Sequence, residues 1–257
     1  MNRPTYQHIR EDNPGGMTLD GTRTYVLHSR DGQGALLIDP GNEMPEHRAA
    51  FLAAVGEAEL RAIVLTHQHA DHSEMLATAD DWAPGVPVYA VLDEFARHVP
   101  TVQDGDVITF GPDPADALTV LRTPGHTSDS ISLLGGDVLF SGDTVLGKGT
   151  TVVTHPEGSL ADYLASIDRL RALVDDGTVS VIEPAHGPTV EDPATVLDHY
   201  ASHRRERVEQ VRAALDQGAA TAEEVRDVVY ADVPENVRAA ALMIVKAQLE
   251  YLGHPVD

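Results

Sequence analysis

The chain contains the stretch Thr66-His67-Gln68-His69-Ala70-Asp71-His72 directly after the apolar run Ala62-Ile63-Val64-Leu65. Three imidazoles and one carboxylate within six residues concentrate the nitrogen and oxygen atoms that bind metal ions. The apolar run is rich in β-branched residues and predicts a buried strand, so the polar side chains would lie on the loop at its C-terminal end. Because side chains alternate along an extended backbone, His67 and His69 would point the same way. Asp71 and His72 would face a second ion.

The composition limits the classes of function open to the chain. Its 257 residues can bury a substantial core and form one large domain, with room for a small appendage. The formal net charge of −23 repels polyanions, which weighs against nucleic acid as a general partner. Cysteine is absent, so any metal site must be built from His, Asp and Glu. No apolar run approaches the about 20 residues of a membrane helix, and the N-terminus lacks a signal-peptide core, so we expect a cytoplasmic protein without membrane contacts.

Short β-rich runs and turn signals predict sheets up to about residue 190. Residues 25–28 and 35–38 flank Asp31-Gly32-Gln33-Gly34, which predicts a hairpin. Helical spacing is found over residues 45–55 and 160–173, a short helical stretch is expected from Ser73, and residues 1–20 are expected to form a loop or an edge segment. Further strands are expected at residues 63–65, 87–90, 107–110, 118–122, 131–134, 138–141 and 179–182.

After Pro193 the pattern becomes helical. Residues 195–215 form one periodic segment, Thr221-Ala222-Glu223-Glu224 is a capping box that opens a second helix, and a third is expected over residues 234–252. We therefore predict two domains, residues 1–195 and a small helical or winged-helix module over residues 196–257. From residue 200 onward the chain has seven Lys and Arg against ten Asp and Glu. This balance predicts a cover over the rim of the site, or a homodimer contact, rather than a duplex DNA-binding surface.

Three more polar residues follow strand-like runs in the same way as the histidine-rich loop. They are His126, Asp143 and His186, each flanked by Gly or Pro, which let the backbone approach a crowded site. Loops at strand ends are positioned by a rigid scaffold and commonly carry function. Together with the first stretch they give five His and two Asp, which matches what two adjacent metal ions require.

These motifs resemble those of the metallo-β-lactamase superfamily. The similarity rests on His67-x-His69-x-Asp71-His72, Gly125-His126-Thr127, Ser141-Gly142-Asp143 and Ala185-His186-Gly187, in this order, over residues 20–190. It implies an α/β fold, a four-layer αβ/βα sandwich with a binuclear site at one edge, and makes residues 1–195 the catalytic domain. Asp39, after an expected strand, resembles a structural position of that fold.

The resemblance also assigns roles to the seven side chains. It implies that His67, His69 and His126 hold one metal, that Asp71, His72 and His186 hold the other, and that Asp143 bridges them with a hydroxide as the second bridge. Paired metals bind an attacking hydroxide and stabilise the developing anion, and zinc lowers the pKa of bound water to about 7. Asp71 would also orient the hydroxide, so Asp71 and Asp143 are the expected catalytic carboxylates. Two Zn²⁺ per chain are expected, with iron and manganese open as alternatives.

Branches of the superfamily differ in features that the sequence displays. The absence of Cys excludes β-lactamases with a thiolate ligand. The presence of Asp143 argues against those β-lactamases that lack a bridging Asp. The segment from Asp143 to His186 is too short for the large insert of the β-CASP nucleases. The remaining likeness is to glyoxalase II, lactonases and, most of all, the β-lactamase-like protein 2 group. Its signatures resemble residues 125–130, 141–151 and 162–166, and the appendage containing Arg204-Arg205-Glu206-Arg207.

The substrate is less constrained than the metal chemistry. We expect a hydrolase that acts on a small anionic ester, thioester or lactone, with Lys148 reaching the anionic group or, as an equal alternative, pointing into solvent. A single-strand endoribonuclease is the second hypothesis, supported by family likeness and opposed by the net charge. The third is a non-catalytic winged-helix DNA-binding protein with a structural metal site. His28 and His155 lie outside the motifs and are expected to be ordinary surface or loop residues.

Overall fold

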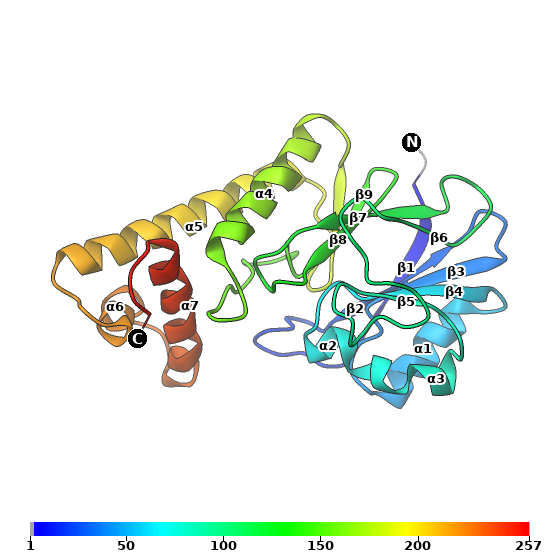
Figure 1. Ribbon diagram of the computed structural model, residues 1–257, viewed down its shortest axis with the longest axis horizontal. Coiled ribbons are helices and arrows are strands. Elements are labelled where there is room, and N and C mark those ends of the chain that lie inside the picture. The colour runs from blue at the N-terminus through cyan, green and yellow to red at the C-terminus, as the bar shows by residue number, and fades with distance from the viewer. Residues whose placement is uncertain (1–2, 257) are drawn as a thin grey trace.

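The computed structural model describes residues 3–256 and has four layers in the order helix, sheet, sheet, helix (Figure 1). The first sheet has the strand order β1-β2-β3-β4-β5, with the bounds Thr5–Arg10, Arg23–His28, Gly34–Ile38, Glu59–Val64 and Val88–Tyr89. The second has the order β10-β9-β8-β7-β6, and β6 to β10 span Val107–Thr109, Ala117–Arg122, Ile131–Gly135, Val138–Gly142 and Val181–Pro184. The predicted αβ/βα sandwich is confirmed.

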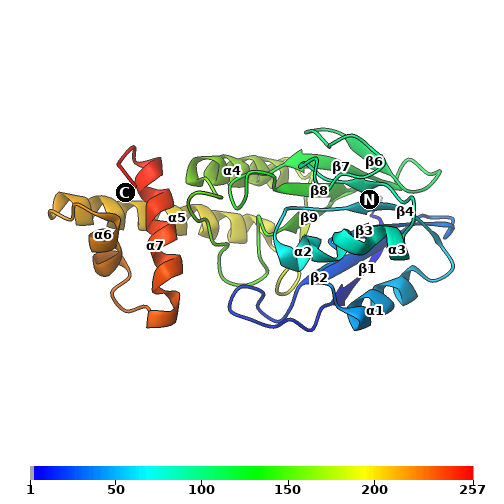
Figure 2. The same cartoon turned by 60° about the horizontal axis from the view of Figure 1, so that its bottom comes forward.

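Helices cover the outer face of each sheet (Figure 2). On the first sheet lies α1 (Pro45–Val55), and the chain after β4 forms the short helices α2 (Ala70–Ser73), η1 (Glu74–Thr78) and α3 (Ala79–Trp82). The second sheet is covered by α4 (Leu160–Asp175) and the first half of α5 (Pro193–Asp216). Among residues 3–256 there is no helix with the length and apolar character that crossing a membrane requires.

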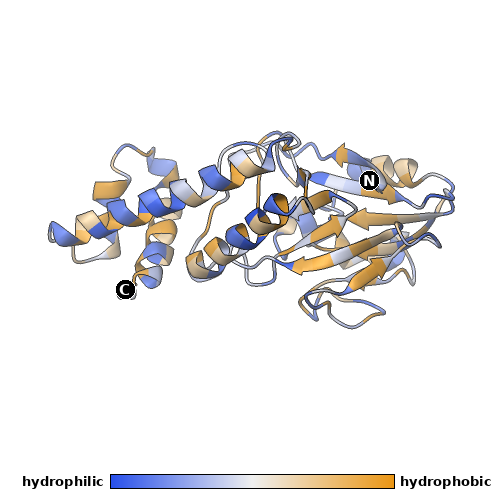
Figure 3. Ribbon diagram, turned by 90° about the horizontal axis from the view of Figure 1, so that it is seen from above, coloured by the Kyte–Doolittle hydropathy of each residue, from blue (hydrophilic) through white to orange (hydrophobic). Residues whose placement is uncertain are grey.

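The period-two alternation of the strands divides the core into layers. In β2, Tyr25 and Leu27 face the second sheet, whereas Val26 packs against α1 and its neighbours. In β9, Phe140 faces the first sheet, and Leu139 packs under α4 and α5. Figure 3 shows the strands as largely hydrophobic, while hydrophobic and hydrophilic residues alternate along α5. Burying a side chain of this size contributes about 1.5–3 kcal/mol, so a one-residue slip of a strand would be strongly unfavourable.

Strand direction brings the polar loops to one edge of the sandwich. β3 and β4 are parallel, β9 and β10 are parallel, and β7 has the direction of β9 because both are antiparallel to β8. Two backbone hydrogen bonds join the sheets there: Ile131 N donates to Thr66 O (2.9 Å), and Arg23 N donates to Ala185 O (2.8 Å). The C-terminal ends of all five strands therefore meet at one place.

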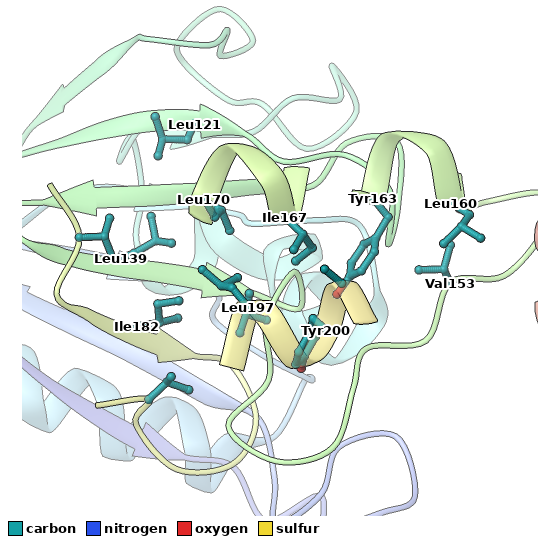
Figure 4. Close-up of a cluster of buried hydrophobic side chains, with 14 of the residues drawn as sticks. Leu121, Leu139, Val153, Leu160, Tyr163, Ile167, Leu170, Ile182, Leu197 and Tyr200 are labelled. Carbon is teal, nitrogen blue, oxygen red and sulfur yellow. The ribbon is translucent and has the colours of Figure 1, made fainter. Parts of the chain in front are cut away.

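The C-terminal helices extend from the second sheet, and α6 (Ala222–Val229) and α7 (Arg238–Tyr251) pack at the far end of α5 (Figure 1). Figure 4 shows Tyr163 of α4 and Tyr200 of α5 within the buried cluster over the second sheet. The three predicted helices are present. Residues 193–256 contain no strand, so the β-hairpin of a winged helix is not observed in the described chain. The division at residue 195 stays a prediction, since α5 passes through it without a break.

Candidate metal centre

The seven predicted side chains converge at the shared edge of the two sheets. His67 and His69 follow β4, and His126 lies between β7 and β8. Asp143 directly follows β9, and His186 lies two residues after the end of β10. Asp71 and His72 lie on α2, which begins at Ala70, three residues before the predicted start. The difference arises because the His69 carbonyl accepts hydrogen bonds from His72 N (2.9 Å) and Ser73 N (3.0 Å), which closes a helical turn.

Three imidazoles form the first cluster. The His69 Nδ1 atom lies 3.0 Å from His67 Nε2 and 3.0 Å from His126 Nε2. One imidazole N–H can satisfy only one such contact, so three nitrogens at this spacing are arranged as ligands of a shared cation would be. Tetrahedral ligands 2.0–2.1 Å from zinc are about 3.4 Å apart, close to the observed spacing.

Two imidazoles and a carboxylate form the second cluster. The Asp71 Oδ2 atom lies 3.4 Å from His72 Nε2 and 3.4 Å from His186 Nε2. Asp143 stands between the clusters: its Oδ2 is 3.6 Å from His126 Nε2, while its Oδ1 is 3.2 Å from His186 Nε2 and 3.7 Å from His72 Nε2. His72 Nε2 and Asp143 Oδ1 are buried without a hydrogen-bond partner in the described chain, and both point where a cation would lie. The donor set therefore fits metal ions.

Asp39 contacts the side of His72 that faces away from the second cluster. Its carboxylate accepts hydrogen bonds from Thr66 N (2.7 Å) and Thr66 Oγ1 (2.7 Å), and its Oδ2 lies 2.9 Å from His72 Nδ1. The residue is buried and has φ of 52°, in the left-handed region that Asp tolerates better than most side chains. The resemblance indicated a structural role for Asp39, and the contacts are those of an anchor for His72.

Two tyrosines and a glycine place the other ligands. The Tyr163 hydroxyl donates to Thr144 O (2.7 Å), and the Tyr200 hydroxyl accepts from Leu146 N (2.8 Å), so helices α4 and α5 fix the loop that follows Asp143. Gly125 precedes His126 with φ of 132°, and a Cβ there would lie 2.3 Å from the backbone N and Cα of Tyr163. Only glycine allows this approach.

The two clusters differ in their electrostatics. Burial lowers the pKa of His67 and of His126, so both are neutral near pH 7 and can offer a lone pair. Burial lowers the pKa of His72 and of His186 as well, but the neighbouring carboxylates raise both pKa values by more. Asp71 and Asp39 hold the pKa of His72 well above its usual value, and Asp143 raises the pKa of His186 to about 9. The pKa values of Asp71 and Asp143 fall below their usual range despite burial, because of the adjacent His72 and His186 charges.

A cavity opens beside the cluster. A volume of about 110 Å³ touches His126 and Asp143, and a second of about 500 Å³ shares Gly16, Leu19 and Lys148 with it. Lys148 is exposed and makes no ion pair with any residue in the described range. No sequence pattern indicated two further contacts, namely the 3.0 Å hydrogen bond from Thr22 Oγ1 to Asp71 Oδ2 and the approach of Glu157 to His69.

Comparisons with known proteins agree with the fold. Residues 17–73 and 74–180 match the model of the Metallo-beta-lactamase superfamily. The Beta-lactamase-like protein 2 homolog of Caenorhabditis elegans is 34% identical over 252 residues, 93% of this chain and 81% of that protein. The atrochrysone carboxyl ACP thioesterase of Aspergillus chevalieri is 30% identical over 251 residues, 93% of this chain and 77% of that protein.

Solved structures share the fold. The metallo-beta-lactamase family protein TTHA1429 from Thermus thermophilus has a TM-score of 0.77 at 22% identity, and the match covers 96% of this chain and 93% of that chain. TTHA1623, solved in a di-iron-bound form, has a TM-score of 0.56 at 25% identity, over 76% of this chain and 98% of its own.

Proposed function

The chain belongs to the metallo-β-lactamase superfamily, and from this premise we propose that it is a binuclear metal-dependent hydrolase. The observation that supports the proposal most directly is the position of Asp143, whose two carboxylate oxygens face different clusters. In the proposal, Asp143 is the shared ligand. His67, His69 and His126 complete the first site, and Asp71, His72 and His186 complete the second.

The donor set narrows the choice of metal. Five imidazoles and two carboxylates without a thiolate suit zinc, iron and manganese. We propose zinc, because neutral imidazoles are its usual nitrogen ligands, and the electrostatics of His67 and His126 keep both neutral. The di-iron form of TTHA1623 makes iron the competing result. Elemental analysis of protein expressed with each metal distinguishes them: about two zinc per chain is expected, and two iron with no zinc would overturn the choice.

Two metal ions, when bound, supply Lewis acidity and a water activated at neutral pH. The residues of the chain orient the reactants. Asp71 is partly exposed and its Oδ2 accepts a hydrogen bond from Thr22 Oγ1, so its carboxylate is held where it could accept a hydrogen bond from the attacking water and align it. The cavity beside Asp143 admits the electrophilic carbonyl.

The walls of the cavity favour a small anionic substrate. Met17, Leu19 and Leu146 supply apolar surface, and Lys148 is the one cation among the described lining residues of the two volumes. One flexible ammonium matches one anionic group, whereas an RNA strand needs a row of cations along its backbone. We therefore propose a small ester, thioester or lactone with an anionic group on the part that Lys148 reaches. The thioesterase name of the Aspergillus chevalieri relative agrees with this class.

The test is a parallel assay of purified protein on acyl thioesters, esters, lactones and unstructured RNA oligonucleotides. We expect thioester or ester turnover that disappears in Asp143→Ala, and a rise in KM with little change in kcat in Lys148→Ala for anionic substrates only. RNA cleavage that is lost in Asp143→Ala, without ester turnover, would favour the endoribonuclease. Tight metal binding with no hydrolysis and a shift of duplex DNA would favour the non-catalytic hypothesis.

A further inference from the structure

The metal-facing histidines share a pattern on their other ring nitrogen. In each, one nitrogen points into a cluster and the second meets an oxygen atom of the surrounding chain. For four of them the second nitrogen is Nδ1, and its contacts are His67 with Thr66 Oγ1 (3.1 Å), His72 with Asp39 Oδ2 (2.9 Å), His126 with Val152 O (2.7 Å) and His186 with Gly21 O (3.4 Å). Such partners fix the tautomer and the plane of a ligating imidazole.

His69 has the opposite orientation. Its Nδ1 faces the first cluster, and its Nε2 lies 3.2 Å from Glu157 Oε2. The other carboxylate oxygen, Glu157 Oε1, accepts a hydrogen bond of 2.6 Å from Gln68 Nε2. Glu157 thus holds two consecutive residues of the histidine-rich loop, although it lies 88 positions after His69 in the sequence.

We propose that Glu157 is the positioning residue of His69, and this inference rests on the proposed metal centre. A carboxylate at Nε2 keeps the proton on that nitrogen, which leaves the Nδ1 lone pair free to bind a cation. The negative charge of the carboxylate also makes the Nδ1 lone pair of the imidazole a stronger ligand for a metal ion. His69 needs such a partner more than the other histidines, because its side chain is 33% exposed and water would otherwise compete for both tautomers.

The loop that carries Glu157 is itself held by α7. The His155 backbone N donates to Met243 O of α7 (3.1 Å), and His155 Nδ1 lies 3.2 Å from Glu250 Oε2 of the same helix. Gly158 packs so closely that a Cβ would lie 2.7 Å from Gly125 O. His155 was expected to be an ordinary loop residue, and its place in this contact explains how a partly exposed carboxylate keeps a defined position.

The experiment measures zinc affinity by competition with a chelator, and the visible spectrum of the cobalt(II)-substituted protein. In Glu157→Ala we expect one of the two equivalents to weaken about 10-fold and the cobalt bands to shift. Glu157→Gln keeps an acceptor oxygen without the charge and should give a smaller loss. Glu59→Gln removes a different exposed carboxylate, paired with Arg61, and should change neither readout.

Failure of the positioning role and failure of the metal centre give different results. If both Glu157 variants bind two zinc ions within twofold of the parent affinity, with unchanged cobalt spectra, the positioning role is wrong while the metal centre stands. If the parent protein binds no metal after metal-supplemented expression, the proposed function itself fails. Urea unfolding of the metal-free variants should match the parent, since a purely structural role would reduce stability instead of affinity.

Discussion

Asp39→Asn tests how the second cluster is held. The native carboxylate accepts three hydrogen bonds inside the protein, two from Thr66 and one from His72. The amide keeps the volume and one acceptor oxygen, which can still serve Thr66 N. Its NH₂ group replaces Oδ2 and meets the Nδ1–H of His72 as donor against donor. A hydrogen bond to a buried charged group is worth about 1.5–3 kcal/mol, and the Thr66 hydroxyl can rotate to accept, so we expect a loss of about 2–4 kcal/mol.

The same substitution should change metal binding through the tautomer of His72. To accept from the new amide, His72 must carry its proton on Nε2, the nitrogen that faces Asp71 and Asp143. That proton blocks the lone pair of the second site. We therefore expect metal content to fall from about two equivalents to about one.

The assays are urea unfolding of chelator-treated protein and elemental analysis of metal-loaded protein. Asp116→Asn is the matched control, because Asp116 is also buried and accepts hydrogen bonds from Arg30 N (3.0 Å) and Asp113 N (3.3 Å) away from the metal centre. It should lower stability and keep two equivalents. An Asp39→Asn protein within about 0.5 kcal/mol of the parent, with full metal content, would refute the reasoning.

Three other perturbations address the ligands, a buried acid and a glycine. His69→Ala should lower the metal content sharply in elemental analysis, and unchanged content would remove His69 from the ligand set. Burial raises the pKa of Glu11 from 4.5 to about 7, so the folded chain binds an extra proton between these values and loses stability as pH rises through this window. Glu11→Gln should therefore match the parent near pH 5 and exceed it by about 2–3 kcal/mol at pH 8 in urea unfolding of metal-free protein, whereas equal stability at pH 8 would contradict the burial argument. Gly125→Ala should cost about 3–5 kcal/mol in thermal unfolding, while Gly105→Ala, with φ of 84° and open space around it, should cost less.

The sequence predicted the strands well because each face of a buried sheet imposes alternation on its residues. Residues 25–28 and 35–38 alternate between two cores, and their hairpin turn contains Gly32 with φ of 69°. The histidine-rich loop was recognisable for a similar reason, since metal ligands must be of few residue types at short spacing. These features lie within short stretches of sequence, so they can be recognised without knowledge of the three-dimensional structure.

Contacts between distant loops could not be predicted in this way. Glu157 lies in an irregular segment between β9 and α4, and no periodicity distinguishes it from other exposed acids. Thr22 and Glu11 act through contacts with Asp71 and Asn42, which lie 49 and 31 positions away in the sequence and come close only in the folded first sheet. The sequence pattern also could not predict that the described chain lacks the β-hairpin of a winged helix. A helical signal over residues 195–252 is shared by winged helices and by plain helical modules.

The C-terminal helices α5 and α7 contact the segment that surrounds the first histidine cluster. Arg204 of α5 is buried, lies over the Tyr163 ring, and donates to Thr151 O, while α7 holds His155. Residues 151–157, which both contacts hold, supply Val152 O to His126 and Glu157 to His69. A displacement of α5 and α7 would thus move the partners of two imidazoles in the first cluster, whereas Asp39, the partner of His72, makes no hydrogen bond to these helices within residues 3–256. The helices that the sequence pattern predicts as an appendage therefore contact the surroundings of the first histidine cluster.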